Sequence, residues 1–275
     1  MATGSASGRP RLTTRGDRVG APVATEGRCA TATRRRSILV RDEFALKGAR
    51  VTRRTPEEAS AFETLSDRYD AWYDSPAGRV LFACELAALR PLLDGTGQLR
   101  LEVGVGTGRF ATALQVEVGV DVAFAPLAFA RGRGVRVAQG TGEQLPFPDG
   151  TFDAVVLVAT LCFVQRPDVV VSEARRVLHA GGRLIVAFVP RDSPWGLRYR
   201  AMGRDGNLFY HDAVFSTVDE ITQLLEHSGV TVVARRSTLF QPPSPEPYAE
   251  NARGGSSDGA GFVVLAGAAS ESTRV

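Results

Sequence analysis

The sequence predicts an α/β fold built on a parallel, doubly wound sheet, and three observations support this prediction. Short apolar runs alternate with helix-like stretches between residues 100 and 190, as in βαβ units. The glycine-rich segment LEVGVGTGRF, residues 101–110, follows the first apolar run, at the position where open α/β sheets bind ligands. The chain has 275 residues and is 44% hydrophobic, which suffices for one large domain with an extension.

Residues 1–55 differ from the rest of the chain in composition. They are rich in Arg, Ser, Thr, Gly and Ala without an apolar period, so we expect a disordered, Arg-rich N-terminal extension. Residues 1–60 carry 13 Arg and Lys against 6 Asp and Glu, a net charge of +7, whereas the whole chain is +3, which leaves −4 for residues 61–275. The extension could be a transit-type targeting segment, a tether or sequence translated from an upstream start codon. Because the body is mildly acidic, no nucleic-acid partner is expected.

Cysteine, histidine and hydropathy narrow the class of protein further. The three cysteines, Cys29, Cys84 and Cys162, are too irregularly spaced for a disulfide framework or a zinc site. The three histidines are scattered, so no metal site is expected. No apolar run reaches the roughly 18 residues of a membrane span. We therefore expect a cytoplasmic protein without a membrane span, and the sequence indicates no particular oligomeric state.

The folded domain is expected over residues 56–270 and begins with helices in residues 56–97. One helix is marked by four apolar residues on a single face and a stop signal after them: Phe82, Leu86, Leu89 and Leu93, then Asp94-Gly95-Thr96-Gly97. The strand candidates that follow are 100–103, 116–120, 135–138, 154–158 and 184–189, with short helices between them.

Helix and strand signals continue to the end of the domain. One helix carries an apolar stripe that ends before two glycines: Val170, Ala174, Val177 and Leu178, then Gly181-Gly182. Thr217 and Glu220 form a capping-box signature at the start of another helix, which Gly229 closes. Two further strands are expected near residues 231–238 and 261–266.

The glycine-rich segment restricts the ligand that the sheet edge can take. Gly104, Gly106 and Gly108 let the backbone adopt positive φ and touch a ligand. The spacing is G-x-G-x-G, with Arg109 where a dinucleotide fingerprint has its third glycine, and the G-K-[ST] of a phosphate loop is absent. The acid before the loop, Glu102, disfavours an anionic ligand and favours a cationic one.

Asp121 adds a second indication of the ligand. It ends the second expected strand, 17 residues beyond Gly104, close to the spacing at which an acid accepts both ribose hydroxyls. Together with Glu102, it favours a ligand with a free ribose, a positive charge and no phosphate. S-adenosyl-L-methionine fits, being an adenosine that carries an ammonium and a sulfonium group. A nicotinamide cofactor is a distant alternative, disfavoured by Arg109.

Five segments in order resemble the class I S-adenosylmethionine-dependent methyltransferases: LEVGVGTGRF, GVD, GEQLPFPDGTFDAVVLV, EARRVLHAGGRLIVAFV and GFVVLAG. Over residues 63–268 the chain is similar to the small-molecule subgroup called methyltransferase type 11, which is related to the ubiquinone and menaquinone C-methylases. The resemblance implies a Rossmann-like three-layer αβα sandwich, whose seven-stranded, mostly parallel sheet has an antiparallel last strand. It also implies an enzyme that transfers a methyl group from S-adenosyl-L-methionine to a small-molecule acceptor by direct SN2 transfer.

The resemblance also implies roles for individual residues. Glu102 and the loop glycines would hold the methionine end, and Asp121 would take the ribose hydroxyls. The segment that closes over adenine often reads G-D-A-E in the family and is Gly140-Thr141-Gly142-Glu143 here, so the Thr141 hydroxyl or the Gly142 amide would replace the missing Asp. The implied cofactor-binding residues are Glu102, Gly104, Gly106, Gly108, Asp121, Val122, Thr141, Gly142, Glu143, Thr160 and Leu161.

Acceptor contacts are expected from two segments that flank the cofactor edge. One is the N-terminal helical stretch, and the other is a substrate-side insertion at residues 190–216. Their aromatic side chains could cage an apolar or cationic acceptor, or could serve as lid packing. The candidate substrate-binding residues are Tyr69, Trp72, Tyr73 and Trp195. The candidate catalytic residues are Tyr210 and His211, the one plausible imidazole base.

Two other functions stay open at this point. One is an RNA or protein methyltransferase that uses the Arg-rich extension as a tether. The other is a non-catalytic S-adenosylmethionine-binding protein, which only the altered adenine segment favours. Since the sulfonium already activates the methyl group, aligning the acceptor and excluding water suffice for transfer, so the lack of a catalytic triad does not argue against an enzyme.

Overall fold

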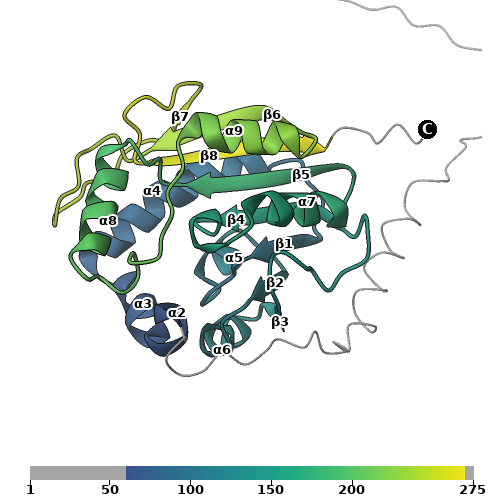
Figure 1. Cartoon of the computed structure of the whole chain (residues 1–275), viewed down its shortest axis with the longest axis horizontal. Coiled ribbons are helices and arrows are strands. Elements are labelled where there is room, and N and C mark those ends of the chain that lie inside the picture. The colour runs from purple at the N-terminus through teal and green to yellow at the C-terminus, as the bar shows by residue number, and fades with distance from the viewer. Residues whose placement is uncertain (1–59, 270–275) are drawn as a thin grey trace, which may run out of the picture. The chain divides into compact units, whose positions relative to one another are not determined.

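The structure, a computed structural model, describes residues 60–269 of the chain. In this part eight strands form one sheet in the order β3-β2-β1-β4-β5-β8-β6-β7 (Figure 1). Strands β1 to β5 pair in parallel, and β8 runs antiparallel to both of its neighbours, β5 and β6. The strand bounds are β1 Arg100–Val103, β2 Val118–Asp121, β3 Arg136–Gln139, β4 Phe152–Val158, β5 Leu178–Phe188, β6 Val230–Thr238, β7 Arg253–Gly254 and β8 Phe262–Ala269.

This topology confirms the predicted fold class, a Rossmann-like and mostly parallel sheet with an antiparallel last strand. The predicted number of seven strands differs from the eight observed in residues 60–269. The additional strand is β7, a two-residue strand that pairs with β6 at the edge of the sheet. Two residues carry no periodicity that a sequence can reveal. Each of the seven predicted strands is present.

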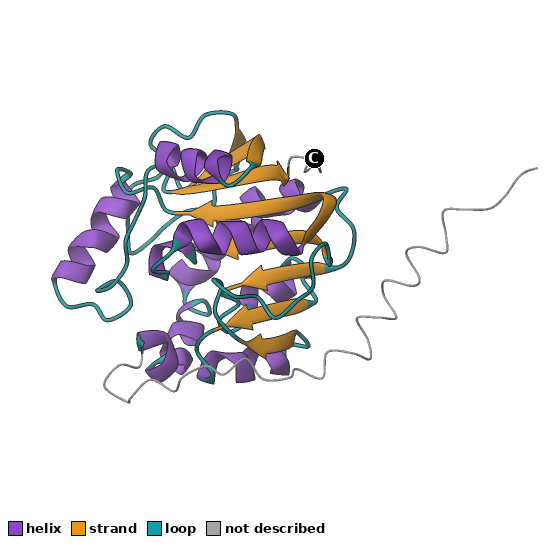
Figure 2. Cartoon of the chain, turned by 45° about the vertical axis from the view of Figure 1, so that its right-hand side comes forward, coloured by secondary structure: helices purple, strands orange, loops and turns teal. Residues whose placement is uncertain are grey.

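Helices cover both faces of this sheet. Figure 2 shows them in front of and behind the strands. Helices α7 and α9 contact each other in front of the sheet, and α4 lies behind it against β5, β6 and β8 (Figure 1). The helix bounds are α2 Ala61–Thr64, α3 Ser66–Trp72, α4 Pro76–Leu93, α5 Arg109–Ala113, α6 Ala125–Gly132, α7 Pro167–Val177, α8 Pro194–Arg204 and α9 Val218–His227, with a 3-10 turn at Leu161–Phe163.

The central strands are buried on both sides, which accounts for their continuous apolar sequences. Ala154, Val156 and Val158 of β4 belong to the hydrophobic cluster that contains the α4 side chains. Val155 and Leu157, between them, are fully buried as well. Because successive strand residues point to opposite faces, both faces of β4 are covered by helices, as parallel sheets require.

The predicted helix signals are present with one exception. Helix α4 has Asp94 as its C-cap, and the predicted capping box at α9 forms with both of its hydrogen bonds, Glu220 N to Thr217 Oγ1 and Thr217 N to Glu220 Oε2. The prediction that Leu178 belongs to the α7 stripe is wrong, because α7 ends at Val177 and Leu178 pairs with Phe152 as the first residue of β5. An apolar residue is buried in either element, so its character could not distinguish the two.

The predicted parts of the domain correspond to identifiable elements. Helices α2, α3 and α4 lie in the expected helical segment 56–97, and α8 lies in the expected insertion 190–216. The predicted extension at residues 1–55 lies outside the described residues. Within residues 60–269, no helix combines the length and the apolar character that crossing a membrane requires.

Candidate functional site

The glycine-rich loop joins β1 to α5 at the carboxyl end of β1, and its glycines serve different purposes. All three have positive φ, 77° at Gly104, 51° at Gly106 and 79° at Gly108. A Cβ on Gly104 would lie 2.5 Å from Thr160 Oγ1, and one on Gly108 would lie 2.8 Å from Ala130 Cα. A Cβ on Gly106 would have no atom within 4 Å. Gly104 and Gly108 therefore permit close packing, whereas Gly106 borders space that a ligand can occupy.

Two carboxyl groups lie beside this loop. Glu102 on β1 is 2% exposed, and its Oε2 has no hydrogen-bond partner. Burial, and then the nearby charge of Asp121, raises the pKa of Glu102 well above its usual range. Burial also raises the pKa of Asp121, against the hydrogen bonds that its carboxylate accepts. Because a buried acid with an unpartnered oxygen is costly until a donor or cation arrives, the loop suits a cationic ligand.

Asp121 is fixed at the end of β2 by two backbone amides. Its Oδ2 accepts from Gly106 N at 2.7 Å, and its Oδ1 accepts from Ala123 N at 2.9 Å. Each carboxylate oxygen has a further lone pair, so the side chain can still accept from a pair of hydroxyls. The next side chain, Val122, is 49% exposed and can contact a ring placed at this edge.

The segment 140–143 reaches the same edge at the carboxyl end of β3. Gly140 N donates to Asp121 O at 3.0 Å. A Cβ on Gly142 would lie 3.1 Å from Val103 Cγ1 of β1, so this segment passes close to the glycine loop. The two remaining predicted side chains of the segment, Thr141 and Glu143, are partly exposed.

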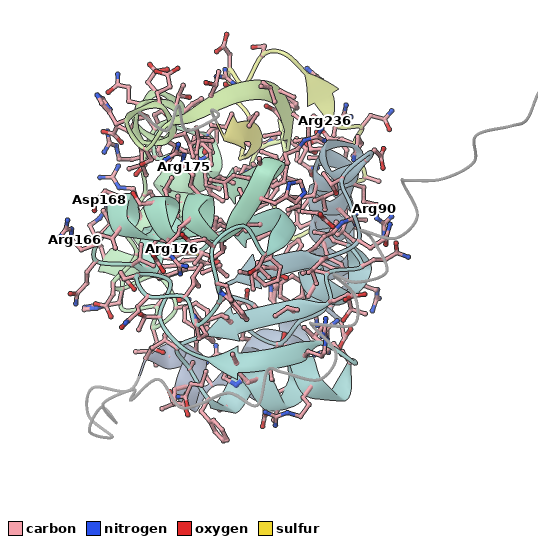
Figure 3. The ribbon with its side chains drawn as sticks, turned by 90° about the vertical axis from the view of Figure 1, so that its right-hand side faces the viewer. Arg90, Arg166, Asp168, Arg175, Arg176 and Arg236 are labelled. Atoms are coloured by element: carbon pink, nitrogen blue, oxygen red, sulfur yellow. The ribbon has the colours of Figure 1, made fainter. Side chains whose placement is uncertain are left out.

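Helix α7 holds the chain that continues from this segment. Glu173 accepts from Leu145 N at 2.9 Å. Arg176, labelled on α7 in Figure 3, donates to the carbonyl oxygens of Leu145 at 3.1 Å and Phe147 at 2.8 Å. These side chains fix the loop that follows residues 140–143.

Thr160 and Leu161 follow the carboxyl end of β4, at the same edge of the sheet as the glycine loop. Thr160 Oγ1 donates to Val103 O at 2.9 Å, which packs the threonine against the glycine loop. Leu161 is 7% exposed and begins the 3-10 turn. Burial raises the pKa of the neighbouring Cys162 to about 12, so this cysteine is a neutral thiol and not a nucleophile at neutral pH.

Arg109 accounts for the absence of a dinucleotide-type third glycine. Its guanidinium binds both carboxylate oxygens of Asp70 at 2.9 and 2.8 Å, and both of Asp74 at 2.9 and 2.6 Å. Arg133, directly after α6, donates to Asp70 Oδ2 at 2.8 Å and to Thr107 O at 2.7 Å. These two arginines clamp α3 onto the glycine loop, and we call the four charged side chains the α3 clamp.

A separate contact attaches α2 to the loop after β2. The Glu63 carboxylate accepts from Phe124 N at 2.6 Å and from Ala125 N at 3.3 Å, at the start of α6, where a negative charge is favourable. Both N-terminal helices are therefore attached to the loops that follow β1 and β2.

The two predicted acceptor segments meet in one aromatic cluster. In Figure 1, α2, α3 and α8 lie on the side of the sheet toward which the β5 arrow points. The ring centroids of Tyr69 on α3 and Phe209 after α8 are 5.8 Å apart, and those of Phe62 on α2 and Phe163 after β4 are 5.0 Å apart. The hydroxyl groups of Tyr69 and Tyr73 lie 3.0 Å apart.

The structure separates the two predicted catalytic residues. Tyr210 stacks on Tyr199 with ring centroids 4.5 Å apart and an interplanar angle of 16°, and burial raises its pKa far above its usual range, so it is a neutral phenol. The side chain of His211 is 67% exposed and its Nδ1 lies 2.8 Å from an oxygen of Asp212, which is 88% exposed. His211 therefore lies in solvent.

The two predicted tryptophans also lie in different surroundings. Trp195 is 4% exposed and its Nε1 donates to Gln241 O at 2.8 Å, which makes it part of the core. Trp72 is 42% exposed and meets the edge of Tyr73 with ring centroids 5.0 Å apart, which places it at the rim of the cluster. Within residues 60–269 no group of three His, Cys, Asp or Glu side chains could hold a metal ion.

Glu85 on α4 is an acid that belongs to none of the recognisable sequence motifs. It is partly exposed, and burial raises its pKa to about 8. The available signal is its place in the helix, three residues after Phe82 and four before Leu89, which puts an acid on the apolar face. Its charge raises the pKa of four tyrosines, Tyr69, Tyr73, Tyr199 and Tyr210.

Known proteins are similar to this chain in sequence and in fold. Residues 101–186, which include Glu102, Asp121 and Thr160, match the family described as Methyltransferase domain, of type 11. The chain is 50% identical over 198 residues to an uncharacterized protein of Mycobacterium tuberculosis, covering 72% of this chain and 70% of that protein. It is 30% identical over 161 residues to the ubiquinone/menaquinone biosynthesis C-methyltransferase UbiE of Nitrosospira multiformis, covering 52% of this chain and 64% of UbiE.

A solved structure extends the similarity to nearly a whole relative. It is the crystal structure of a protein from Thermotoga maritima described as a SAM-dependent methyltransferase, possible histamine N-methyltransferase. The two chains are 36% identical with a TM-score of 0.70, and the similarity covers 76% of this chain and 98% of that one.

Proposed function

We propose that this chain, which belongs to the class I S-adenosylmethionine-dependent methyltransferases of type 11, methylates a small-molecule acceptor. The enzyme class and the cofactor, S-adenosyl-L-methionine, follow from the family. The proposal concerns the acceptor and the residues of the site. The observation that carries it is the buried Oε2 of Glu102, which has no hydrogen-bond partner, on the strand that leads into the glycine loop. In that loop a Cβ on Gly106 would meet no protein atom within 4 Å, and the aromatic cluster supplies the proposed acceptor side.

The residues beside the glycine loop fit S-adenosyl-L-methionine. The ammonium and sulfonium groups would offset the two acids, of which Glu102 has an oxygen without a partner. Asp121 can accept from the ribose hydroxyls, and the exposed Val122 can contact adenine. The proposed cofactor-binding residues remain Glu102, Gly104, Gly106, Gly108, Asp121, Val122, Thr141, Gly142, Glu143, Thr160 and Leu161.

The chain's own part in the reaction is positioning. S-adenosyl-L-methionine supplies a methyl group that its sulfonium already activates. Helices α2 and α3 are attached through Glu63 and Asp70 to the loops where the cofactor would lie. In that position they would help to exclude water from the reacting groups. Tyr69, Tyr73 and Tyr210 would line the acceptor side. His211 and Trp195 are left out, because one lies in solvent and the other in the core.

The small-molecule acceptor is supported by charge and by the named relatives. Residues 61–275 carry a net charge of −4, whereas a nucleic-acid partner favours a basic surface. The Nitrosospira protein is named as a C-methyltransferase of ubiquinone/menaquinone biosynthesis, and the Thermotoga protein is described as a possible histamine N-methyltransferase. The low cysteine content supports the cytoplasmic location expected from the sequence.

Two measurements test the proposal. Calorimetric titration of the full chain with S-adenosyl-L-homocysteine, with NAD and NADP as controls, measures cofactor binding. Transfer of a tritiated methyl group to a cell extract is then followed in two fractions, separated by ultrafiltration into small molecules and macromolecules. Label in the small-molecule fraction supports the proposal. Label confined to the macromolecules would make the acceptor an RNA or a protein.

Substitution of single loop glycines should separate ligand contact from packing. Gly106→Ala is expected to weaken S-adenosyl-L-homocysteine binding about tenfold or more, because its Cβ enters space where no protein atom lies within 4 Å. Gly108→Ala is expected to destabilise the fold by about 2–4 kcal/mol, since its Cβ would lie 2.8 Å from Ala130 Cα. Calorimetric titration and thermal unfolding of both variants measure the two effects. Unaltered affinity in Gly106→Ala would mean that the ligand does not approach this glycine.

A further inference from the structure

Exposed apolar side chains gather around the aromatic cluster. Within residues 60–269, nine large apolar side chains are exposed, and five of them belong to α3, to the turn after β4, or to α8 and the loop that follows it. These five are Trp72, Phe163, Leu197, Leu208 and Val214, and their exposed fractions run from 38% at Phe163 to 72% at Val214. Apolar side chains that gather on one side of a protein commonly mark a surface that binds a partner.

Direct contacts bring the turn after β4 and the loop after α8 together. Val214 N donates to the carbonyl oxygen of the residue before Phe163 at 2.8 Å. The ring centroid of Phe163 lies 5.0 Å from that of Phe62, which in turn lies 5.6 Å from that of Phe209. Leu208 precedes Phe209 in the chain. The exposed apolar side chains of these two segments therefore border the same cluster.

Helix α8 adds a basic face to this side of the molecule. Figure 1 shows α8 at the margin of the molecule, beyond the ends of the strands. Its inner side packs closely, because a Cβ on Gly203 would overlap the carbonyl oxygen of Tyr210. Its outer side carries four exposed side chains within about half of the helix circumference: Leu197, Arg198, Arg200 and Arg204. An apolar residue therefore lies between basic ones on the outer side.

The three arginines of α8 are not neutralised by acids. Within residues 60–269 none of them forms an ion pair or a side-chain hydrogen bond, and α8 itself contains no acid. The acids nearest along the chain are Asp192 before the helix, Asp205 at its C-cap and Asp212 in the following loop. Because two of these acids flank the ends of the helix and the third follows it, the outer side between the ends keeps its positive charge and fits an anionic partner.

We propose that the outer side of α8 and the exposed apolar residues beside the aromatic cluster dock this protein on the surface of an anionic lipid bilayer. The guanidinium groups would bind lipid phosphates, while Leu197 and its apolar neighbours would enter the boundary between head groups and acyl chains. A nucleic acid would pair with the arginines but would leave Leu197, Leu208 and Val214 in water. A lipid surface accommodates both kinds of side chain, which favours it as the partner.

Docking of this kind is peripheral and reversible. No helix within residues 60–269 is long and apolar enough to cross a membrane, so the attachment depends on the outer side of α8 and the apolar residues near it. Each arginine close to an anionic bilayer raises the affinity about fivefold, and salt weakens this contribution. In this orientation the aromatic cluster, with Trp72 at its rim, faces the lipid.

Sedimentation with lipid vesicles tests the proposed surface. The full chain is mixed with vesicles of phosphatidylcholine alone and with vesicles that contain about one third phosphatidylglycerol. We expect binding to the anionic vesicles only, and weaker binding at high salt. Replacing Arg200 and Arg204 together by glutamine should lower the affinity about 10- to 25-fold. Thermal unfolding verifies that the variant folds.

The matched control removes two exposed arginines at the other end of the sheet, Arg90 and Arg131. Helices α4 and α6, which carry them, end shortly before β1 and β3, at the amino ends of these strands. Replacing both by glutamine should leave the vesicle affinity nearly unchanged. Residues 1–60 also carry a net charge of +7, so the α8 variant is tested again in a chain whose residues 34–36, all arginine, are glutamine. The effect of the α8 substitutions should persist there.

Tryptophan fluorescence gives a second readout, of the orientation on the membrane. The chain has two tryptophans, of which Trp72 is 42% and Trp195 4% exposed. Anionic vesicles whose phosphatidylcholine carries brominated acyl chains should quench the emission of the unaltered chain, because Trp72 reaches the lipid. Most of this quenching should be absent in Trp72→Phe, since Trp195 lies in the core.

Four outcomes would overturn the inference. These are no binding to anionic vesicles, an equal loss of affinity in the α8 variant and the matched control, a loss confined to the substitutions at residues 34–36, and bound protein that brominated lipid does not quench. A polyglutamate peptide is titrated in parallel. Binding of this peptide without binding of vesicles would make the partner of α8 an acidic protein instead of a membrane.

Discussion

Asp121→Ala is expected to weaken the binding of S-adenosyl-L-homocysteine by about 1–3 kcal/mol, which is about 5- to 150-fold. The substitution removes the acceptor proposed for both ribose hydroxyls. It also releases the Gly106 and Ala123 amides, which the carboxylate accepts from at 2.7 and 2.9 Å. The loop therefore loses its side-chain contact with the end of β2 together with the ligand contact, while Gly104 N and Val105 N still donate to Val120 O. Calorimetric titration of the variant and the unaltered chain measures the difference.

Two companion variants separate these contributions. Asp121→Asn keeps one carbonyl oxygen for a backbone amide, so its affinity should lie between those of the unaltered chain and Asp121→Ala. Asp258→Ala removes an exposed acid in the loop before β8 and should bind normally. Full affinity in Asp121→Ala would exclude this residue from ribose binding. A lower melting temperature with unchanged affinity would assign it a purely structural role.

The arrangement of the proposed cofactor edge could be predicted from the sequence because its elements are local. A glycine-rich turn directly after a buried strand is recognisable in ten residues, and Glu102 is part of it. Asp121 is recognisable because parallel strands end at the same edge of the sheet. In the structure Asp121 Oδ2 accepts a hydrogen bond from Gly106 N at 2.7 Å, so two segments identified separately lie together at one edge of the sheet.

The acceptor side was less predictable because its contacts join distant parts of the chain. The sequence marks the aromatics of both segments but not which of them meet. Trp195 and Tyr199 lie on the same helix. Trp195 is buried in the core, where its Nε1 donates to Gln241 O, whereas Tyr199 stacks on Tyr210. Glu85 was missed because an acid on an apolar helix face departs from the pattern that identifies the helix.

Arg109 is a single residue whose contacts with distant parts of the chain could not be predicted from the sequence. In the sequence Arg109 stands where a dinucleotide-binding loop has its third glycine, and it therefore disfavours dinucleotide ligands. In the structure it binds Asp70 and Asp74, located 39 and 35 residues earlier in the chain. Together with the contact of Glu63 on Phe124 N, this attaches α2 and α3 to the cofactor edge. The helices proposed to border the acceptor are therefore held in place by charged contacts from the residues that flank the glycine loop.

Asp70→Ala should reveal how much stability the α3 clamp contributes. We expect a loss of about 3 kcal/mol, or about 6–12 °C in melting temperature. The Asp70 side chain is 10% exposed and accepts from both Arg109 and Arg133, so truncation leaves two partly buried guanidinium groups without their shared partner. Asp74, 68% exposed, pairs with Arg109 alone. Calorimetric unfolding measures the loss, and faster hydrogen exchange of the α3 amides would locate it.

The same carboxylate should make part of the stability depend on pH. Burial opposes the ionisation of Asp70, but the hydrogen bonds from Arg109 and Arg133 outweigh it and hold its pKa well below its usual range. A group with a depressed folded-state pKa stabilises fully above its unfolded value of about 4, and this contribution is lost as the pH falls below that value. The difference in melting temperature between the unaltered chain and Asp70→Asn should therefore shrink from about pH 6 to about pH 3. Asp168→Asn, at an exposed pair with Arg166 (Figure 3), should show almost no difference at either pH, and a constant gap for Asp70→Asn would mean that the clamp acts through packing and not through charge.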